Sequence, residues 1–202
     1  MKTLRQYIET EIIPRYDSFD AAHRRDHVEY VIAQSLKLAE HYDVDRDMVY
    51  VIAAYHDTGL AVDRKTHHLE SGRIIRSDRS LRKWFNEGQI ETMAQAVEDH
   101  RASSDHEPRS IYGKIVAEAD RQIDPETIIR RTVQYGLSHY PGLDREGHWN
   151  RMLEHLNEKY AEGGYLRLWI PESDNAAKLR ERHGLIRDRD YLESLFDKFY
   201  KP

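Results

Sequence analysis

Apolar side chains recur every three or four residues along almost the whole chain, and this spacing constrains the fold most strongly. It is the spacing of one face of an α-helix, and no useful length of sequence alternates apolar and polar residues as a β-strand does. Such stripes run from Leu4 to Phe199, interrupted by a polar loop at 101–110 and a Pro-Gly turn at 141–142. Only residues 165–170 resemble an extended segment. The sequence therefore predicts an all-α fold.

Proline and capping residues locate several helix ends. Pro14 is expected to end the first helix, because proline inside a helix removes a backbone hydrogen bond. Asp45 has the side chain of an N-cap, and Gly59 lies just beyond the end of the helix that Asp45 begins. The dipeptide at 124–125, Asp-Pro, predicts the start of a later helix, since proline is favoured at the first helical position.

A chain of 202 residues without a linker rich in Gly, Ser or Pro is typical of one domain. We expect a helical core over residues 1–125 and a helical C-terminal extension, residues 126–202, packed on that core. The extension carries basic and aromatic side chains that either close over a cleft of the core or form core and dimer surface. A homodimer is therefore among the expected partners.

Composition and charge exclude several classes of protein. Cysteine is absent, which excludes disulfides, iron–sulfur clusters, thiolate metal sites and cysteine nucleophiles. The formal net charge of −5 argues against a protein that tracks nucleic-acid phosphates. The longest apolar run, Met48–Tyr55, is far shorter than the roughly 20 residues that span a bilayer. We expect a cytoplasmic protein with no membrane and no nucleic acid among its partners.

Histidines and carboxylates recur on the apolar faces of the predicted helices. His27 precedes Val31 by one helical turn, and the pair His56-Asp57 closes the third helix on its buried face. A buried carboxylate is costly unless it is paired or bound to a metal. The remaining residues of this pattern are His68, His100 and Asp120. Helical segments far apart in the sequence thus direct metal-binding side chains inward, where a helix bundle can bring them together.

At these residues the sequence resembles the HD-domain metal-dependent phosphohydrolase superfamily. The family pattern is a His, an adjacent His-Asp, and a distant Asp, which here are His27, His56-Asp57 and Asp120. His68 and His100 fit two further histidines that many members add. The resemblance covers roughly residues 20–125 and implies a single helical HD-type domain. The segment after Asp57 lacks the Glu-Asp pair of guanosine polyphosphate hydrolases, and there is no Gly-Tyr-Pro motif of the cyclic-di-nucleotide branch.

The mixed nitrogen and oxygen ligand set indicates a divalent transition metal (Mn, Fe, Co or Ni) or Mg rather than structural zinc. One metal ion with four protein ligands is the first expectation. If His68 and His100 also bind, Asp57 bridges two ions. The metal would activate water for attack on a phosphoryl group. Asp57 is then a ligand and a candidate proton acceptor, and Glu70 is a candidate general acid or base, unless it is merely a solvated helix carboxylate.

The resemblance implies a metal-dependent phosphohydrolase that acts on a small phosphorylated metabolite, with a nucleotide as the first choice. Substrate contacts are expected from cations beside the ligands. These are Arg24, Lys65, Arg101 and Arg121. Two alternatives stay open: a di-iron oxygenase of the same superfamily, which would need all six ligands, and a non-catalytic, metal-stabilised module that senses a ligand.

Overall fold

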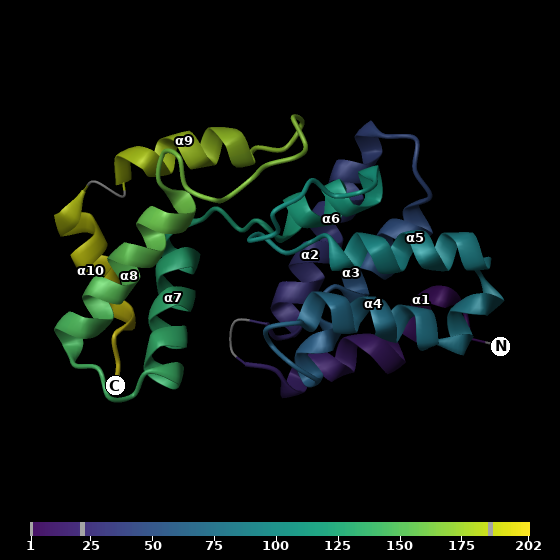
Figure 1. Cartoon of the computed structure of the whole chain (residues 1–202), viewed down its shortest axis with the longest axis horizontal. Coiled ribbons are helices and arrows are strands. Elements are labelled where there is room, and N and C mark those ends of the chain that lie inside the picture. The colour runs from purple at the N-terminus through teal and green to yellow at the C-terminus, as the bar shows by residue number, and fades with distance from the viewer. Residues whose placement is uncertain (1, 21–22, 186–187) are drawn as a thin grey trace. The chain divides into compact units, whose positions relative to one another are not determined.

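The computed structural model describes residues 2–20, 23–185 and 188–202. Every regular element within these residues is a helix and none is a strand, which confirms the predicted all-α fold. The stretch 165–170, the one extended candidate, forms no regular element. The chain divides into two compact units, Met1–Arg121 and Gln122–Pro202, whose helices Figure 1 labels.

The first unit is built around α3, which is apolar over its last eight residues. Every residue of α3 from Met48 to Tyr55 is buried, and the helix packs against α2, α5 and α6, while α4 packs on α5. Burying one large apolar side chain stabilises a fold by about 1.5–3 kcal/mol, so a helix buried on all sides forms the centre of the core. The α-helices of this unit have the bounds α1 Leu4–Tyr7, α2 Arg25–Leu38, α3 Arg46–Tyr55, α4 His67–Ser77, α5 Glu87–Glu98 and α6 Ile111–Asp120.

The predicted caps are confirmed. The Asp45 carboxylate accepts hydrogen bonds from the backbone N–H groups of Asp47 and Met48, at 2.9 and 3.3 Å, and so fixes where α3 begins. Asp124 accepts from the N–H of Thr127 at 2.8 Å, with Pro125 at the first position of α7. Because each cap sets the rotation of the helix that follows, it also sets which side chains face the core.

The expectation that Pro14 ends the first helical segment is wrong. The chain continues from α1 through a π-helical turn, Ile8–Ile12, into a 3-10 helix, Ile13–Ser18. Pro14 is the second residue of this 3-10 helix, where its missing N–H is not needed. The continued winding buries Tyr16 completely, and the Tyr16 hydroxyl donates to the Ala54 carbonyl oxygen at 2.9 Å.

The second unit contains the helices α7 Pro125–His139, α8 Arg145–Tyr160, α9 Asn175–Leu185 and α10 Arg189–Phe199. α7 packs against α8 and α10, and α9 packs against α8. Aromatic contacts join two of these helices: the ring of Trp149 meets Phe196 edge-on at 5.3 Å, and Phe196 stacks on Tyr200 at 5.1 Å.

The boundary between the units lies after Arg121, four residues before the expected end of the core. That the C-terminal unit packs on the core stays a prediction. Among the described residues, none of the helices has the length and apolar character needed to cross a bilayer.

Candidate metal centre

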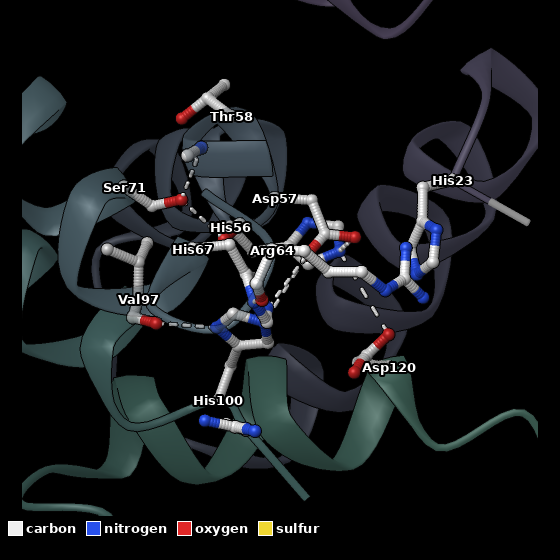
Figure 2. A network of polar contacts seen from close by, with 12 residues as sticks. His23, His56, Asp57, Thr58, Arg64, His67, Ser71, Val97, His100 and Asp120 are labelled. Carbon is white, nitrogen blue, oxygen red and sulfur yellow. Dashed lines mark hydrogen bonds and ion pairs between the residues drawn. The ribbon is translucent and has the colours of Figure 1, made fainter. Parts of the chain in front are cut away.

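Three helices and two turns of the first unit bring histidines and aspartates to one place (Figure 2). His27 lies in the first turn of α2, and His56 with Asp57 directly follows α3; all three are buried. His67 begins α4, and His100 follows the end of α5. Asp120, the last residue of α6, completes the cluster.

The carboxylate of Asp57 lies between two pairs of histidines. Its Oδ2 atom is 3.1 Å from Nε2 of His56 and 3.5 Å from Nε2 of His27. Its Oδ1 atom is 3.4 Å from Nε2 of His67 and 3.5 Å from Nε2 of His100. Within each pair the two Nε2 atoms are 3.3 Å apart. Two groups of potential metal ligands therefore share Asp57.

Asp120 adds a second carboxylate to the group that contains His27. Its Oδ1 atom lies 3.3 Å from Nε2 of His27 and 4.0 Å from Nε2 of His56. The Asp120 side chain is 22 % exposed, whereas those of His27 and Asp57 are 4 % and 5 % exposed. The cluster is therefore closed on the Asp57 side and reachable by solvent near Asp120.

Three of the histidines are oriented in the same way. In His56, His67 and His100 the Nδ1–H group donates to the backbone carbonyl three residues earlier. This bond fixes the neutral ring in the tautomer whose Nε2 carries a lone pair, and it is how proteins orient histidine ligands of metals. The accepting carbonyls are those of Ala53, Arg64 and Val97, at 2.8, 2.8 and 2.5 Å.

The donor atoms fit divalent metal ions. When the rings are neutral, Nε2 lone pairs and carboxylate oxygens face one another across 3.1–3.5 Å. All of these atoms are hydrogen-bond acceptors, so they are stable so close together only with a positive charge between them. Imidazole nitrogen and carboxylate oxygen together suit Mn, Fe, Co or Ni. Among the described residues the ligand groups are His27, His56 and Asp57, and Asp57, His67 and His100.

The electrostatics of the cluster keep both carboxylates ionised. Burial alone would raise the pKa of Asp57, but the histidines around it hold that pKa well below its usual range. The pKa of Asp120 is likewise held low, chiefly by His27. Burial alone would lower the pKa of His56, yet the charge of Asp57 raises it to about 9. Burial lowers the pKa of His67 to about 4, which leaves that ring neutral.

Buried hydroxyl groups hold the turn that carries His56 and Asp57. The Ser71 hydroxyl of α4 donates to the His56 carbonyl at 2.8 Å and accepts from the Gly59 N–H at 2.9 Å. On the other side, the Tyr16 hydroxyl accepts from the Asp57 N–H at 3.3 Å. The turn is thus held from both α4 and the segment that precedes α2.

The structure places His67, not the predicted His68, beside Asp57. Successive residues of a helix differ by about 100° in direction, so only one of the two adjacent histidines can face the cluster. α4 begins at His67 and its Ser71 face packs on the His56 turn, which directs the His67 ring inward. His68 belongs to neither ligand group, and its buried Nδ1 atom has no hydrogen-bond partner among the described residues.

The cations predicted to contact substrate have different surroundings. Arg121 is buried, and its guanidinium donates to the His100 carbonyl at 2.9 Å and lies 3.4 Å from Asp120. It therefore supports the ligands rather than extending toward a substrate. Arg101 donates to the backbone carbonyl of Lys65 at 2.9 Å. The side chains of Lys65 and Arg24 are exposed.

Glu70, the candidate general acid or base, forms an ion pair with Arg73 on α4. Its side chain is 17 % exposed. Glu70 belongs to neither group of potential metal ligands, so the geometry gives it no evident catalytic part.

Sequence reasoning missed His67, although a signal for it was present. Polar residues at 63–66 separate the apolar run of α3 from the next stripe, and a helix that begins directly after them starts at the first of the two histidines. It also passed over His23 and Arg64, whose side chains lie next to the cluster in Figure 2.

Comparisons with known proteins agree with this geometry. The HD domain family matches residues 24–122, which contain all six residues of the cluster. No match was found among curated proteins. A crystal structure of a predicted HD superfamily hydrolase from an uncultured Thermotogales bacterium is similar in fold. It has 19% sequence identity and a TM-score of 0.50, over 75% of this chain and 83% of that one. Residues 24–122, with the His-Asp cluster that they form, are an HD domain.

Proposed function

We propose that this protein is a metal-dependent phosphohydrolase that acts on a small phosphorylated metabolite, with nucleotides as the leading class. The HD domain at residues 24–122 and its histidine–aspartate cluster support a metal-dependent hydrolase. One observation carries the proposal furthest: the two oxygens of Asp57 each face a separate pair of histidines.

We propose two metal ions rather than one. A carboxylate whose oxygens face different ligand groups is suited to bridge two cations, and paired ions clamp the attacking and leaving oxygens of a phosphoryl transfer. His27, His56 and Asp120 would hold one ion, and His67 and His100 the other, with Asp57 shared. The nitrogen and oxygen donors favour Mn, Fe, Co or Ni. Mg, a hard cation that prefers oxygen ligands, is the alternative.

A bound divalent metal supplies a Lewis acid and water of lowered pKa. The chain supplies orientation: the bonds from Nδ1 to backbone carbonyls fix three rings before any substrate arrives. Asp57, whose oxygens face both pairs of histidines, would serve as a ligand. Asp120, whose carboxylate is the most exposed of the cluster, lies where water can reach it.

Phosphate release tests the proposal. Metal-stripped protein is reloaded with Mn, Co, Ni or Mg and incubated with nucleoside mono-, di- and triphosphates, cyclic nucleotides and sugar phosphates. We expect turnover that requires metal and is lost in Asp57→Ala. Asp47→Ala, which removes an exposed carboxylate at the start of α3, is the matched control and keeps full activity. Folded, metal-loaded protein that releases phosphate from none of these compounds would overturn the proposal.

The same six donors also meet the ligand requirement of the oxygenase alternative. Iron that co-purifies with the protein, combined with absent phosphate release, would shift the assignment to that class. Metal analysis of the purified protein separates the two functions before any substrate is known.

A further inference from the structure

At the edge of the metal centre, the carboxylate of Asp20 pairs with an arginine and a histidine. Asp20 accepts from Nη1 of Arg64 at 2.5 Å through one oxygen, and from Nδ1 of His23 at 2.8 Å through the other. Asp20 and His23 belong to the segment before α2, whereas Arg64 precedes α4. The two segments are 44 residues apart in sequence and meet at this carboxylate.

The side chains of Arg64 and His23 are both next to metal ligands. The ring of His23 meets the ring of His27 edge-on, with the centroids 5.8 Å apart. The backbone carbonyl of Arg64 is the one that orients His67. Figure 2 shows the Arg64 side chain extending from the segment before α4 toward His23. An anion bound by Arg64 and His23 would therefore lie at the edge of the metal centre.

The chemistry of the pair matches a phosphoryl group. A guanidinium presents several N–H donors in a plane and pairs well with phosphate oxygens, and an imidazole adds one more donor. The pair now binds the carboxylate of Asp20, which is an anion with the same oxygen acceptors. The side chains of Arg64 and Asp20 are 39 % and 41 % exposed, and an ion pair in contact with water is readily exchanged for another anion.

We propose that Arg64 and His23 bind a phosphoryl group of the substrate, and that Asp20 occupies this place until the substrate displaces it. The proposal rests on the phosphohydrolase function, to which it adds two specificity-determining residues and an internal competitor. Asp20 would also hold Arg64 in position between turnovers.

Binding of inorganic phosphate to the manganese-loaded full chain tests this proposal by isothermal titration calorimetry. Arg64→Ala removes a charge-assisted contact, and we expect the dissociation constant for phosphate to rise roughly 10- to 100-fold. Asp20→Asn removes the competing charge, and we expect tighter binding than in the wild type. Arg82→Ala is the matched control: Arg82 is 37 % exposed and paired with Glu87, and we expect no change.

The two variants are expected to change the affinity for phosphate in opposite directions, so a general loss of folding cannot produce both results. If Arg64→Ala does not fold, tighter binding by Asp20→Asn still supports the proposal, because misfolding does not strengthen binding. Equal manganese content in all variants shows that the metal ligands are intact. Phosphate binding within twofold of the wild type in both Arg64→Ala and Asp20→Asn would overturn the proposal, as would wild-type protein that binds no phosphate.

Hydrolysis assays on the same samples separate this proposal from the function on which it rests. Metal-dependent turnover with a KM that neither variant changes would leave the phosphohydrolase function standing and refute the role of Arg64. If the affinity for phosphate falls in Arg64→Ala and rises in Asp20→Asn, but no substrate is turned over, the anion site is supported and the hydrolase function is refuted.

Discussion

Replacing Gly59 by alanine tests how the turn after α3 is packed against α4. A β-carbon built on Gly59 would lie 2.0 Å from the carbonyl oxygen of His67 and 2.7 Å from the backbone nitrogen of Ser71. Both are main-chain atoms of α4, so no side-chain rotation can relieve the contact. The backbone of Gly59 does not have a positive φ, and the restriction is therefore one of space.

The size of the effect follows from this geometry. Overpacking a buried site typically costs 1–3 kcal/mol, and a clash with backbone belongs at the upper end, about 3 kcal/mol. Unfolding entropy near 2.1 cal/mol/K per residue gives about 0.25 kcal/mol/K for the unit Met1–Arg121. We therefore expect the Tm of this unit to fall by about 12 °C. Because α4 must move, His67 should also move away from Asp57 and weaken one of the two metal groups.

Differential scanning calorimetry and a manganese titration measure both effects. Gly142→Ala is the control, because a β-carbon on Gly142 meets nothing within 4 Å. We expect Gly142→Ala to unfold and bind manganese like the wild type. If Gly59→Ala changes the Tm by less than about 2 °C, the close packing of the turn on α4 is refuted.

Three further predictions concern stability and protonation. Tyr16→Phe leaves the Asp57 N–H and the Ala54 carbonyl without the hydroxyl, and should lower the free energy of unfolding by about 1–3 kcal/mol in urea titrations; an unchanged midpoint would count against this support. Because the pKa of His56 is about 9 in the metal-free protein, metal binding at pH 7 should release a proton, measurable as a binding enthalpy that varies with the ionisation enthalpy of the buffer. Burial and nearby cations lower the pKa of His155 from 6.5 to about 4, so the folded state binds its proton less well than the unfolded state. The second unit should then lose up to about 2 kcal/mol of stability between pH 7 and pH 5, and His155→Gln should remove that loss.

The fold was largely predictable because its information is local. Apolar stripes define the helices, and caps such as Asp45 and Asp124 define where they begin. Pro14 shows the limit of such signals: proline breaks a helix in its interior, but it is accepted in the first turn of a new one. The new turn at Pro14 brings Tyr16 into contact with Ala54 of α3. This contact joins residues far apart in the sequence, so the local pattern around Pro14 does not predict it.

The candidate site was predictable by residue type but not in full by position. The apolar faces identified His27, His56, Asp57, His100 and Asp120, which the structure brings together. The choice between two adjacent histidines was wrong. His68 shares a helix face with Gly72 and Ile75, but His67 lies one turn before Ser71, which packs on the His56 turn.

The cations near the ligands were harder to assign, since proximity in sequence does not determine direction. Arg121 follows a ligand directly, yet it is buried and bonded to the His100 carbonyl. Arg64 is far from Asp20 in sequence, and only the folded chain brings them together.

Manganese stoichiometry tests whether a pair of metal sites shares Asp57. Metal-stripped protein is titrated with manganese, and bound metal is counted per chain in the wild type, His67→Ala and Asp57→Ala. We expect two ions in the wild type, one in His67→Ala, and greatly weakened binding of both in Asp57→Ala. A wild-type protein that binds no manganese, or a His67→Ala variant that still binds two ions, would contradict the account.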